Sequence, residues 1–237
     1  MGSRPFSHGG FSGVVRVGDE SWAFGNADRA HEVPNTVDTQ FAIASGAKGF
    51  TALVAVSTLP LALRVRELLG EDLPLVDDRV TVEHLLRHRS GLGDYVDEDV
   101  HEDFEAYLMP VPVHELATTL AYLPVLEGHP QKFTPGERFT YCNSGFVVLA
   151  LLAERASGRS FYDLVDELIC EPAGMRDTRF FARIRSRGRR QSATSPTGER
   201  TCSICRYAGA GTAASTRRQP IWRDSGSGSC STSGSSA

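Results

Sequence analysis

Ser45 and Lys48 stand three residues apart, a spacing that places a hydroxyl and an amine on the same side of one helical turn. A serine with a proton acceptor beside it can attack a carbonyl carbon as a nucleophile. Tyr141 and Asn143, much further along the chain, add a phenol and an amide that a loop could bring to the same place. This set of residue types predicts acyl-transfer chemistry.

The choice of lysine at position 48 adds weight to that prediction. Lys48 and Lys132 are the only lysines among 25 basic residues. A lysine can give up its proton when burial and neighbouring charges favour the neutral form, whereas an arginine stays charged. A serine near the start of a helix is nevertheless more often a cap than a nucleophile, so Ser45 and Lys48 alone leave a structural interpretation open.

The elements that must position these residues can be predicted from periodicity and turn signals. Residues 11–17 and 21–25 flank Gly18-Asp19 and predict a β-hairpin, and 41–44 is a short apolar run that predicts another strand. A helix should follow, with Ser45 at its start and Lys48 one turn inside it. Further helices are expected at 61–69, 82–88, 102–108, 113–122, 145–156 and 160–171, with Thr81 capping the second and Asn143 or Ser144 capping the fifth. Strands followed by several helices favour the α+β class.

Charge divides the chain near Phe181. Residues 1–181 carry 15 basic and 27 acidic side chains. Residues 182–237 carry the other 10 of the 25 basic side chains and only 2 of the 29 acidic ones. Residues 182–237 contain no Leu, Val, Phe or Met but 12 serines. Such a segment has too little apolar surface to offset its ordering entropy, so we predict a disordered, low-complexity tail.

Cysteines and hydropathy limit the protein classes that fit. The five cysteines are an odd number without the spacing of a small disulfide framework, which favours a reducing, cytoplasmic location. No stretch reaches the roughly 18 apolar residues of a membrane span, and no export signal opens the chain, although a leader could precede it.

Four passages in order resemble the serine β-lactamase and penicillin-binding protein family, in its class C-like esterase and D-peptidase branch. They are FAIASGAKGFTA (41–52), VEHLLRHRSGLGDY (82–95), FTPG with FTYCNSGF (133–146) and PAGMRDT (172–178). The resemblance covers roughly 11–181. It implies a β-lactamase/transpeptidase-like α+β fold, an antiparallel sheet flanked by helices, with a helical subdomain at about 61–170.

The resemblance also implies roles for four side chains. Ser45 would be the acylated nucleophile, Lys48 its proton partner, Tyr141 a second base or leaving-group acid, and Asn143 an amide that orients Lys48 and the substrate. The backbone N–H of Ser45 would supply half of an oxyanion hole. The implied protein is a serine hydrolase of esters, amides or β-lactams that needs no metal or cofactor and takes a small-molecule or peptide substrate.

Other candidate sites have weaker support. His84 and His88 share a helix face but lack the Glu of a His-Glu-x-x-His zinc site, and His114-Glu115 has Thr118 where a second His would stand. Cys202 and Cys205 form a lone CxxC pair in the predicted tail. Arginines at 183–190 could attract anionic surfaces, but no aromatic or helical reader of nucleic acid accompanies them, so we expect no nucleic-acid partner.

The chain departs from the family pattern after residue 181. The family has further strands there, one of which carries a Lys/His-x-Gly motif, whereas 182–237 contain neither lysine nor histidine. Read from the third base of each codon, allowed codons for 190–224 can encode GGIYSTAADM, a family passage. We therefore predict a frame slip near Phe181 that truncates the domain, which resequencing the DNA around that codon would test. The alternatives to an active hydrolase are a catalytically impaired fragment and a binding module that uses its basic tail.

Overall fold

The computed structural model describes residues 10–97, 108–180 and 212–215. The predicted helix at 102–108 falls almost entirely outside these ranges. So does most of the predicted disordered tail at 182–237, and with it the lone CxxC pair and the arginine run.

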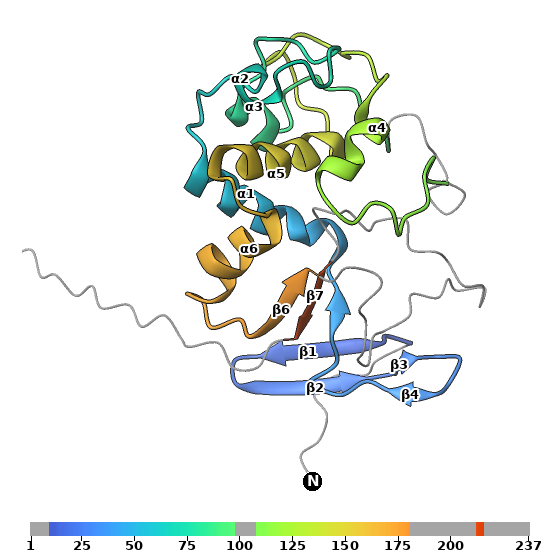
Figure 1. Cartoon of the computed structure of the whole chain (residues 1–237). Helices are drawn as coiled ribbons and strands as arrows, with labels where there is room; N and C mark the ends of the chain where they lie inside the picture. The colour runs from blue at the N-terminus through green and yellow to red at the C-terminus, as the bar shows by residue number, and fades with distance from the viewer. Residues whose placement is uncertain (1–9, 98–107, 181–211, 216–237) are drawn as a thin grey trace, which may run out of the picture.

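Three small sheets occupy one end of the molecule (Figure 1). The strands are β1 (Gly13–Val17), β2 (Glu20–Phe24), β3 (Asn26–Asp28), β4 (Val33–Pro34), β5 (Phe41–Ala42), β6 (Asp177–Phe180) and β7 (Thr212–Ser215). Antiparallel β1 and β2 pair Gly13 with Phe24 and Val17 with Glu20, which confirms the predicted hairpin and its two-residue turn. A second antiparallel pair joins β3 to β4, and the third sheet has the order β5-β7-β6.

Strand β7 lies within the segment predicted to be disordered. Its backbone pairs antiparallel with β5 on one side and with β6 on the other. For Thr212–Ser215 the structure therefore has a paired strand in place of the predicted disorder. The reason is that β5 and β6 each present an edge of backbone N–H and C=O groups, and a short extended segment between them satisfies both.

The helices stack above the sheets in Figure 1. They are η1 (Ala44–Ala47), α1 (Lys48–Thr58), α2 (Arg66–Leu69), α3 (Val82–Leu86), η2 (Leu120–Tyr122), α4 (Leu123–Leu126), α5 (Asn143–Ser157), α6 (Phe161–Val165) and η3 (Asp166–Cys170). Helix α5 is central: every residue from Asn143 to Ala153 is buried, and α5 packs against α1, α2, α3 and α6. A helix that is apolar on all sides belongs in a core.

Several helix predictions are confirmed, with changes at the ends. Thr81 caps α3 as predicted, and Gly158 ends α5 with φ +69°. The predicted helix at 160–171 divides into α6 and the π-helical η3. The cap of α5 is Cys142, whose Sγ accepts a hydrogen bond from the Gly145 N–H, and not Asn143 or Ser144.

Two helix predictions, at 61–69 and 113–122, are wrong over much of their length because the backbone or side chains there form hydrogen bonds with distant segments. Helix α2 covers only the last part of 61–69, since the N–H groups of Val65, Val82 and Glu83 tie residues 61–65 to the 80–83 segment. Residues 113–119 form turns and bends, and a helix starts only at Leu120. There the buried Thr119 hydroxyl donates to Glu154 on α5, a contact that propensity cannot reveal.

Candidate active site

Ser45 lies in the tight turn between the sheet and the central helices. Strand β5 ends at Ala42, and the chain reverses through Ala44, whose φ of +44° is unusual for a residue with a Cβ. Ser45 follows in the 3-10 turn η1, and α1 begins at Lys48, so Ser45 precedes the α-helix that was predicted to start with it. This turn leaves Ser45 exposed at the base of α1.

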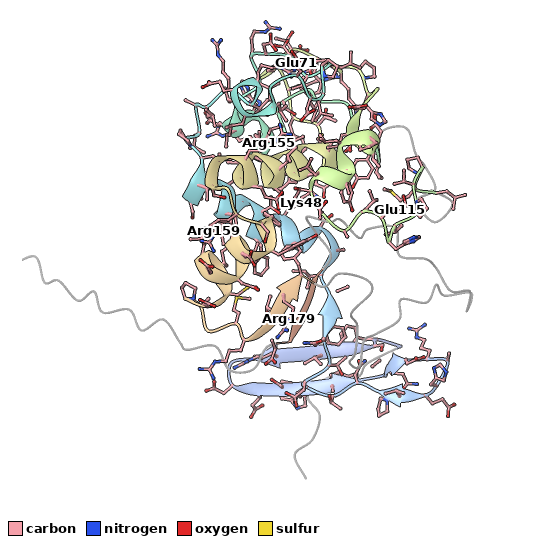
Figure 2. The ribbon with its side chains drawn as sticks, viewed as in Figure 1. Lys48, Glu71, Glu115, Arg155, Arg159 and Arg179 are labelled. Carbon is pink, nitrogen blue, oxygen red and sulfur yellow. The ribbon has the colours of Figure 1, made fainter. Side chains whose placement is uncertain are left out.

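Lys48 is buried beneath α5, with 8% of its surface exposed (Figure 2). Its Nζ donates to Ser45 Oγ at 3.2 Å and to Asn143 Oδ1 at 3.1 Å. The Nζ also lies 4.8 Å from the centroid of the Tyr141 ring, where the ring face attracts a cation. The amine is therefore held against the serine by an amide and an aromatic ring.

Tyr141 approaches Ser45 from the segment that leads into α5. Its phenol donates to Ser45 Oγ at 2.9 Å. Because Lys48 Nζ donates to the same oxygen, Ser45 Oγ accepts two hydrogen bonds, one from the start of α1 and one from a distant loop. An oxygen in this position can pass its proton to either partner once their protonation states allow it.

Asn143 is the first residue of α5 and has only 3% of its surface exposed. Its Oδ1 accepts from Lys48, and its Nδ2 donates to the Val96 carbonyl at 3.1 Å. Both ends of the amide are used, which fixes which end faces the lysine. The structure thus brings Ser45, Lys48, Tyr141 and Asn143 together as one cluster.

Asp94 anchors the start of α5 and was not identified as a site residue from the sequence. Its buried carboxylate accepts the backbone N–H of Asn143, and both the N–H and the hydroxyl of Ser144 at 2.9 Å. A carboxylate at a helix N-terminus satisfies unpaired N–H groups and interacts favourably with the helix dipole. Asp94 therefore holds Asn143 against Lys48. The signal in the sequence that could have identified Asp94 was its place in the 82–95 passage.

Glycines allow the loop that carries Asp94 to pack closely. Gly91 has φ +69°, and a Cβ there would lie 2.1 Å from the Phe133 carbonyl oxygen. A Cβ at Gly93 would lie 2.6 Å from His129 Cβ. Only residues without a side chain fit at these two positions.

The histidine pair considered as a metal site has other partners. His84 Nδ1 accepts the Thr81 N–H in the capping box of α3, and His88 Nδ1 accepts the Cys142 N–H at 3.1 Å. Across the described ranges, no group of three or more His, Cys, Asp or Glu side chains could hold a metal ion. His114 and Glu115 lie on the surface with 3.9 Å between Nε2 and Oε1.

Burial shifts the pKa of two side chains near Tyr141, those of Cys142 and His88. Burial raises the pKa of the Cys142 thiol far above its usual range, so this thiol stays protonated and is a poor nucleophile. Burial, helped by the positive charge of Lys48, lowers the pKa of His88. Cys142 therefore serves as a helix cap, and Ser45 is the hydroxyl that has proton-transfer partners.

The family model described as Beta-lactamase matches residues 6–233, so the chain belongs to the beta-lactamase family. Penicillin-binding protein 4* of Bacillus subtilis is 34% identical over 171 residues, which cover 68% of this chain and 35% of that protein. A D-aminopeptidase of Brucella anthropi is 33% identical over 179 residues, which cover 71% of this chain and 32% of that protein. The chain spans about a third of the length of these relatives.

Solved structures agree on the fold. The penicillin-binding protein from Bacillus halodurans has a TM-score of 0.73 and 30% identity, and the match covers 85% of this chain and 65% of that one. The D-amino acid amidase from Ochrobactrum anthropi SV3 has a TM-score of 0.65 at 21% identity over 85% of this chain and 60% of that one. The predicted β-lactamase/transpeptidase-like α+β fold is confirmed. No helix within the described ranges has the length and apolar character to cross a membrane.

Proposed function

We propose that this chain is a serine hydrolase that forms an acyl-enzyme at Ser45 on an ester, amide or β-lactam bond. The observation that carries the proposal is the pair of hydrogen bonds that Ser45 Oγ accepts, from Lys48 Nζ at 3.2 Å and from Tyr141 OH at 2.9 Å. A nucleophile needs one partner to take its proton and a second to protonate the leaving group. Family membership supports the same reaction class.

The reaction proceeds in two stages. Ser45 Oγ bonds to the substrate carbonyl carbon while its proton passes to Lys48 or Tyr141. The bond from that carbon to the leaving amine or alkoxide then breaks, and the leaving group takes a proton from the same pair. Water next attacks the acyl carbon, the acid is released, and the Ser45 hydroxyl regains its proton.

Asn143 and the backbone of Ser45 complete the proposed machinery. The Asn143 Oδ1 contact supports the role of orienting Lys48, since its Nδ2 is already bound to the Val96 carbonyl. The N–H of Ser45, in the turn η1, supplies one donor to the oxyanion that develops on the carbonyl oxygen.

For the substrate we propose an amide whose acyl group is a D-residue, or a β-lactam. The basis is that two relatives at 33–34% identity carry the names D-aminopeptidase and penicillin-binding protein 4*. A small molecule or peptide is therefore the proposed partner.

The experiment that tests this function measures acylation and turnover separately. The whole chain is incubated with a fluorescent penicillin, with D- and L-phenylalanine p-nitroanilide, and with p-nitrophenyl acetate, and intact mass reports any adduct. We expect one covalent adduct per chain, placed on Ser45 by peptide mapping, and a preference for the D-anilide. Ser45→Ala should abolish the adduct.

Ser57→Ala is the matched control, because Ser57 is an exposed serine on α1, the helix that begins three residues after Ser45. It should acylate like the wild type. An adduct that forms equally well on Ser45→Ala would contradict the proposed nucleophile. An adduct that forms without turnover would instead favour the alternative of a catalytically impaired fragment.

A further inference from the structure

His88 sits at an unusual point of the backbone, directly after α3. Its φ is +53°, in the left-handed region that residues with a Cβ rarely adopt. The His88 N–H donates to the Leu85 carbonyl, and the Arg89 N–H donates to the His84 carbonyl, so His88 forms the reversal that ends the helix. Glycine usually fills such a position, and a histidine here implies that its side chain makes compensating contacts.

The His88 ring contacts three aromatic rings of the segment that carries Tyr141. Its centroid lies 4.7 Å from that of Tyr141 and 4.9 Å from that of Phe146, with interplanar angles of 31° and 30°. The Phe139 ring forms a T-shaped contact with the His88 ring, with 5.7 Å between the centroids. These contacts limit the positions that the Tyr141 ring can take.

His88 also binds the backbone on both sides of Tyr141. Its carbonyl accepts the Thr140 N–H at 2.9 Å, and its Nδ1 accepts the Cys142 N–H at 3.1 Å. His88 therefore binds the backbone N–H of the residue before Tyr141 and of the residue after it, and it contacts the Tyr141 ring as well.

We propose that His88 is the positioning residue for Tyr141, and that in its neutral form it holds the phenol on Ser45 Oγ. This inference rests on the proposed function, in which Tyr141 exchanges a proton with Ser45 or the leaving group. His88 does not touch Ser45 through any contact of the described residues, so it acts through Tyr141.

The bond to Cys142 requires a neutral imidazole. An Nδ1 that accepts a hydrogen bond leaves the single ring proton on Nε2, and a second proton on Nδ1 would face the Cys142 N–H. The charged groups near the ring are Lys48 of α1, which opposes protonation, and Asp94 of the loop after α3, which favours it. Burial is the largest influence, and the pKa falls below its ordinary 6.5.

The sign of the pH effect follows from that direction. Because the folded pKa is lowered, the unfolded chain binds more protons in this range, and the contribution of His88 is present at neutral pH and lost as pH falls through and below 6.5. Protonation should therefore release the Tyr141 segment on the acid side and slow acylation there.

Two substitutions distinguish the role of the Nδ1 acceptor of His88 from the role of its aromatic ring. His88→Asn keeps an acceptor at the position of Nδ1 and tolerates positive φ, whereas His88→Phe keeps the aromatic contacts and removes the acceptor. We expect acylation of His88→Phe by the fluorescent penicillin to fall about tenfold or more at every pH. His88→Asn should retain more of the rate and lose the acid decline that comes from His88. His114→Asn, at an exposed surface histidine, should match the wild type.

A second readout does not depend on reactivity. In ¹⁵N-histidine-labelled protein, the His88 signal, assigned by its absence from His88→Asn, should show an unprotonated Nδ1 at pH 7 and a titration midpoint below the ordinary 6.5. The Tyr141 ring signals should move with the same midpoint.

The outcomes distinguish the two proposals. If the wild type forms no adduct with any probe, the proposed function fails, and the NMR titration still tests the link between His88 and Tyr141. The positioning role is overturned if the titration midpoint of His88 is not below the ordinary 6.5, if the Tyr141 signals do not follow it, or if a reactive chain keeps its rate and pH profile in both variants.

Discussion

Lys48 differs from Lys132, the other lysine of the chain, in what surrounds its amine. Lys48 Nζ bonds to a hydroxyl and an amide oxygen, whereas Lys132 Nζ forms a 2.6 Å ion pair with Asp97. The ion pair of Lys132 needs only a positive charge, which an arginine also supplies, whereas the proposed role of Lys48 needs a proton that can be transferred. This difference allows a matched comparison of the two lysines.

Replacement of Lys48 by arginine should remove proton transfer while keeping the positive charge. We expect acylation of Lys48→Arg to fall by about 10²–10⁴, because a guanidinium does not give up its proton at neutral pH. Lys132→Arg should keep its pairing with Asp97 and stay within about twofold of the wild-type rate. Stopped-flow acylation by a fluorescent penicillin would measure both, with urea midpoints as a check on folding. A Lys48→Arg chain that reacts at the wild-type rate would exclude Lys48 as the proton partner.

At the scale of elements, the loop after α3 aligns the site through close packing. It carries Asp94, which fixes the start of α5, and its approach to the 131–133 segment depends on Gly91. The Gly91 carbonyl also accepts the Lys132 N–H at 2.7 Å. A substitution at Gly91 should therefore disturb the candidate active site, although Gly91 contacts none of its four clustered side chains.

A comparison of Gly91→Ala with Gly158→Ala separates the cost of backbone strain from the cost of close packing. Both glycines have φ +69°, but of the two only Gly91 has other atoms close to the position of an added Cβ. We expect Gly158→Ala to lower the free energy of unfolding by about 1–2 kcal/mol, the cost of a left-handed alanine. Gly91→Ala should cost about 2–5 kcal/mol, since a Cβ would overlap the Phe133 carbonyl as well. Urea unfolding of both variants measures this. Equal losses of unfolding free energy would show that the loop after α3 moves enough to accommodate a Cβ at Gly91.

The hairpin and α5 could be predicted from sequence because their signals are local. Alternating strands around Gly18-Asp19 and an apolar run before Gly158 specify structure over a few residues. Residues 61–65 and 113–119 could not be predicted in the same way, because their backbone and side chains bond to segments far away in sequence. Propensity is a weak prior where tertiary partners compete.

At the scale of the whole molecule, β7 is the one described part of the segment from 182 onward. The frame slip near Phe181 and the disorder of the remaining tail stay predictions. The family match runs past Phe181 to residue 233. The contribution of β7 to stability can be measured directly.

Two truncations isolate the contribution of β7. A chain that ends at residue 181 lacks β7, and one that ends at residue 219 keeps it, while both lack Trp222 and so report through Trp22 alone. We expect the longer chain to be more stable by about 1–3 kcal/mol, because β7 pairs with both β5 and β6. Urea unfolding followed by Trp22 fluorescence would show this. Equal midpoints would instead support the prediction that the whole tail is disordered.

The sequence by itself determined the family, the α+β class and the four side chains of the candidate site, because these depend on residue types in ordered local passages. Only the tertiary structure brought Tyr141 onto the Ser45 oxygen that Lys48 reaches from one turn away, and placed Asp94 and His88 behind Asn143 and Tyr141. Those contacts join segments that local signals treat separately. Their geometry follows from how α1, α5 and the loop after α3 pack, which no spacing along the chain encodes.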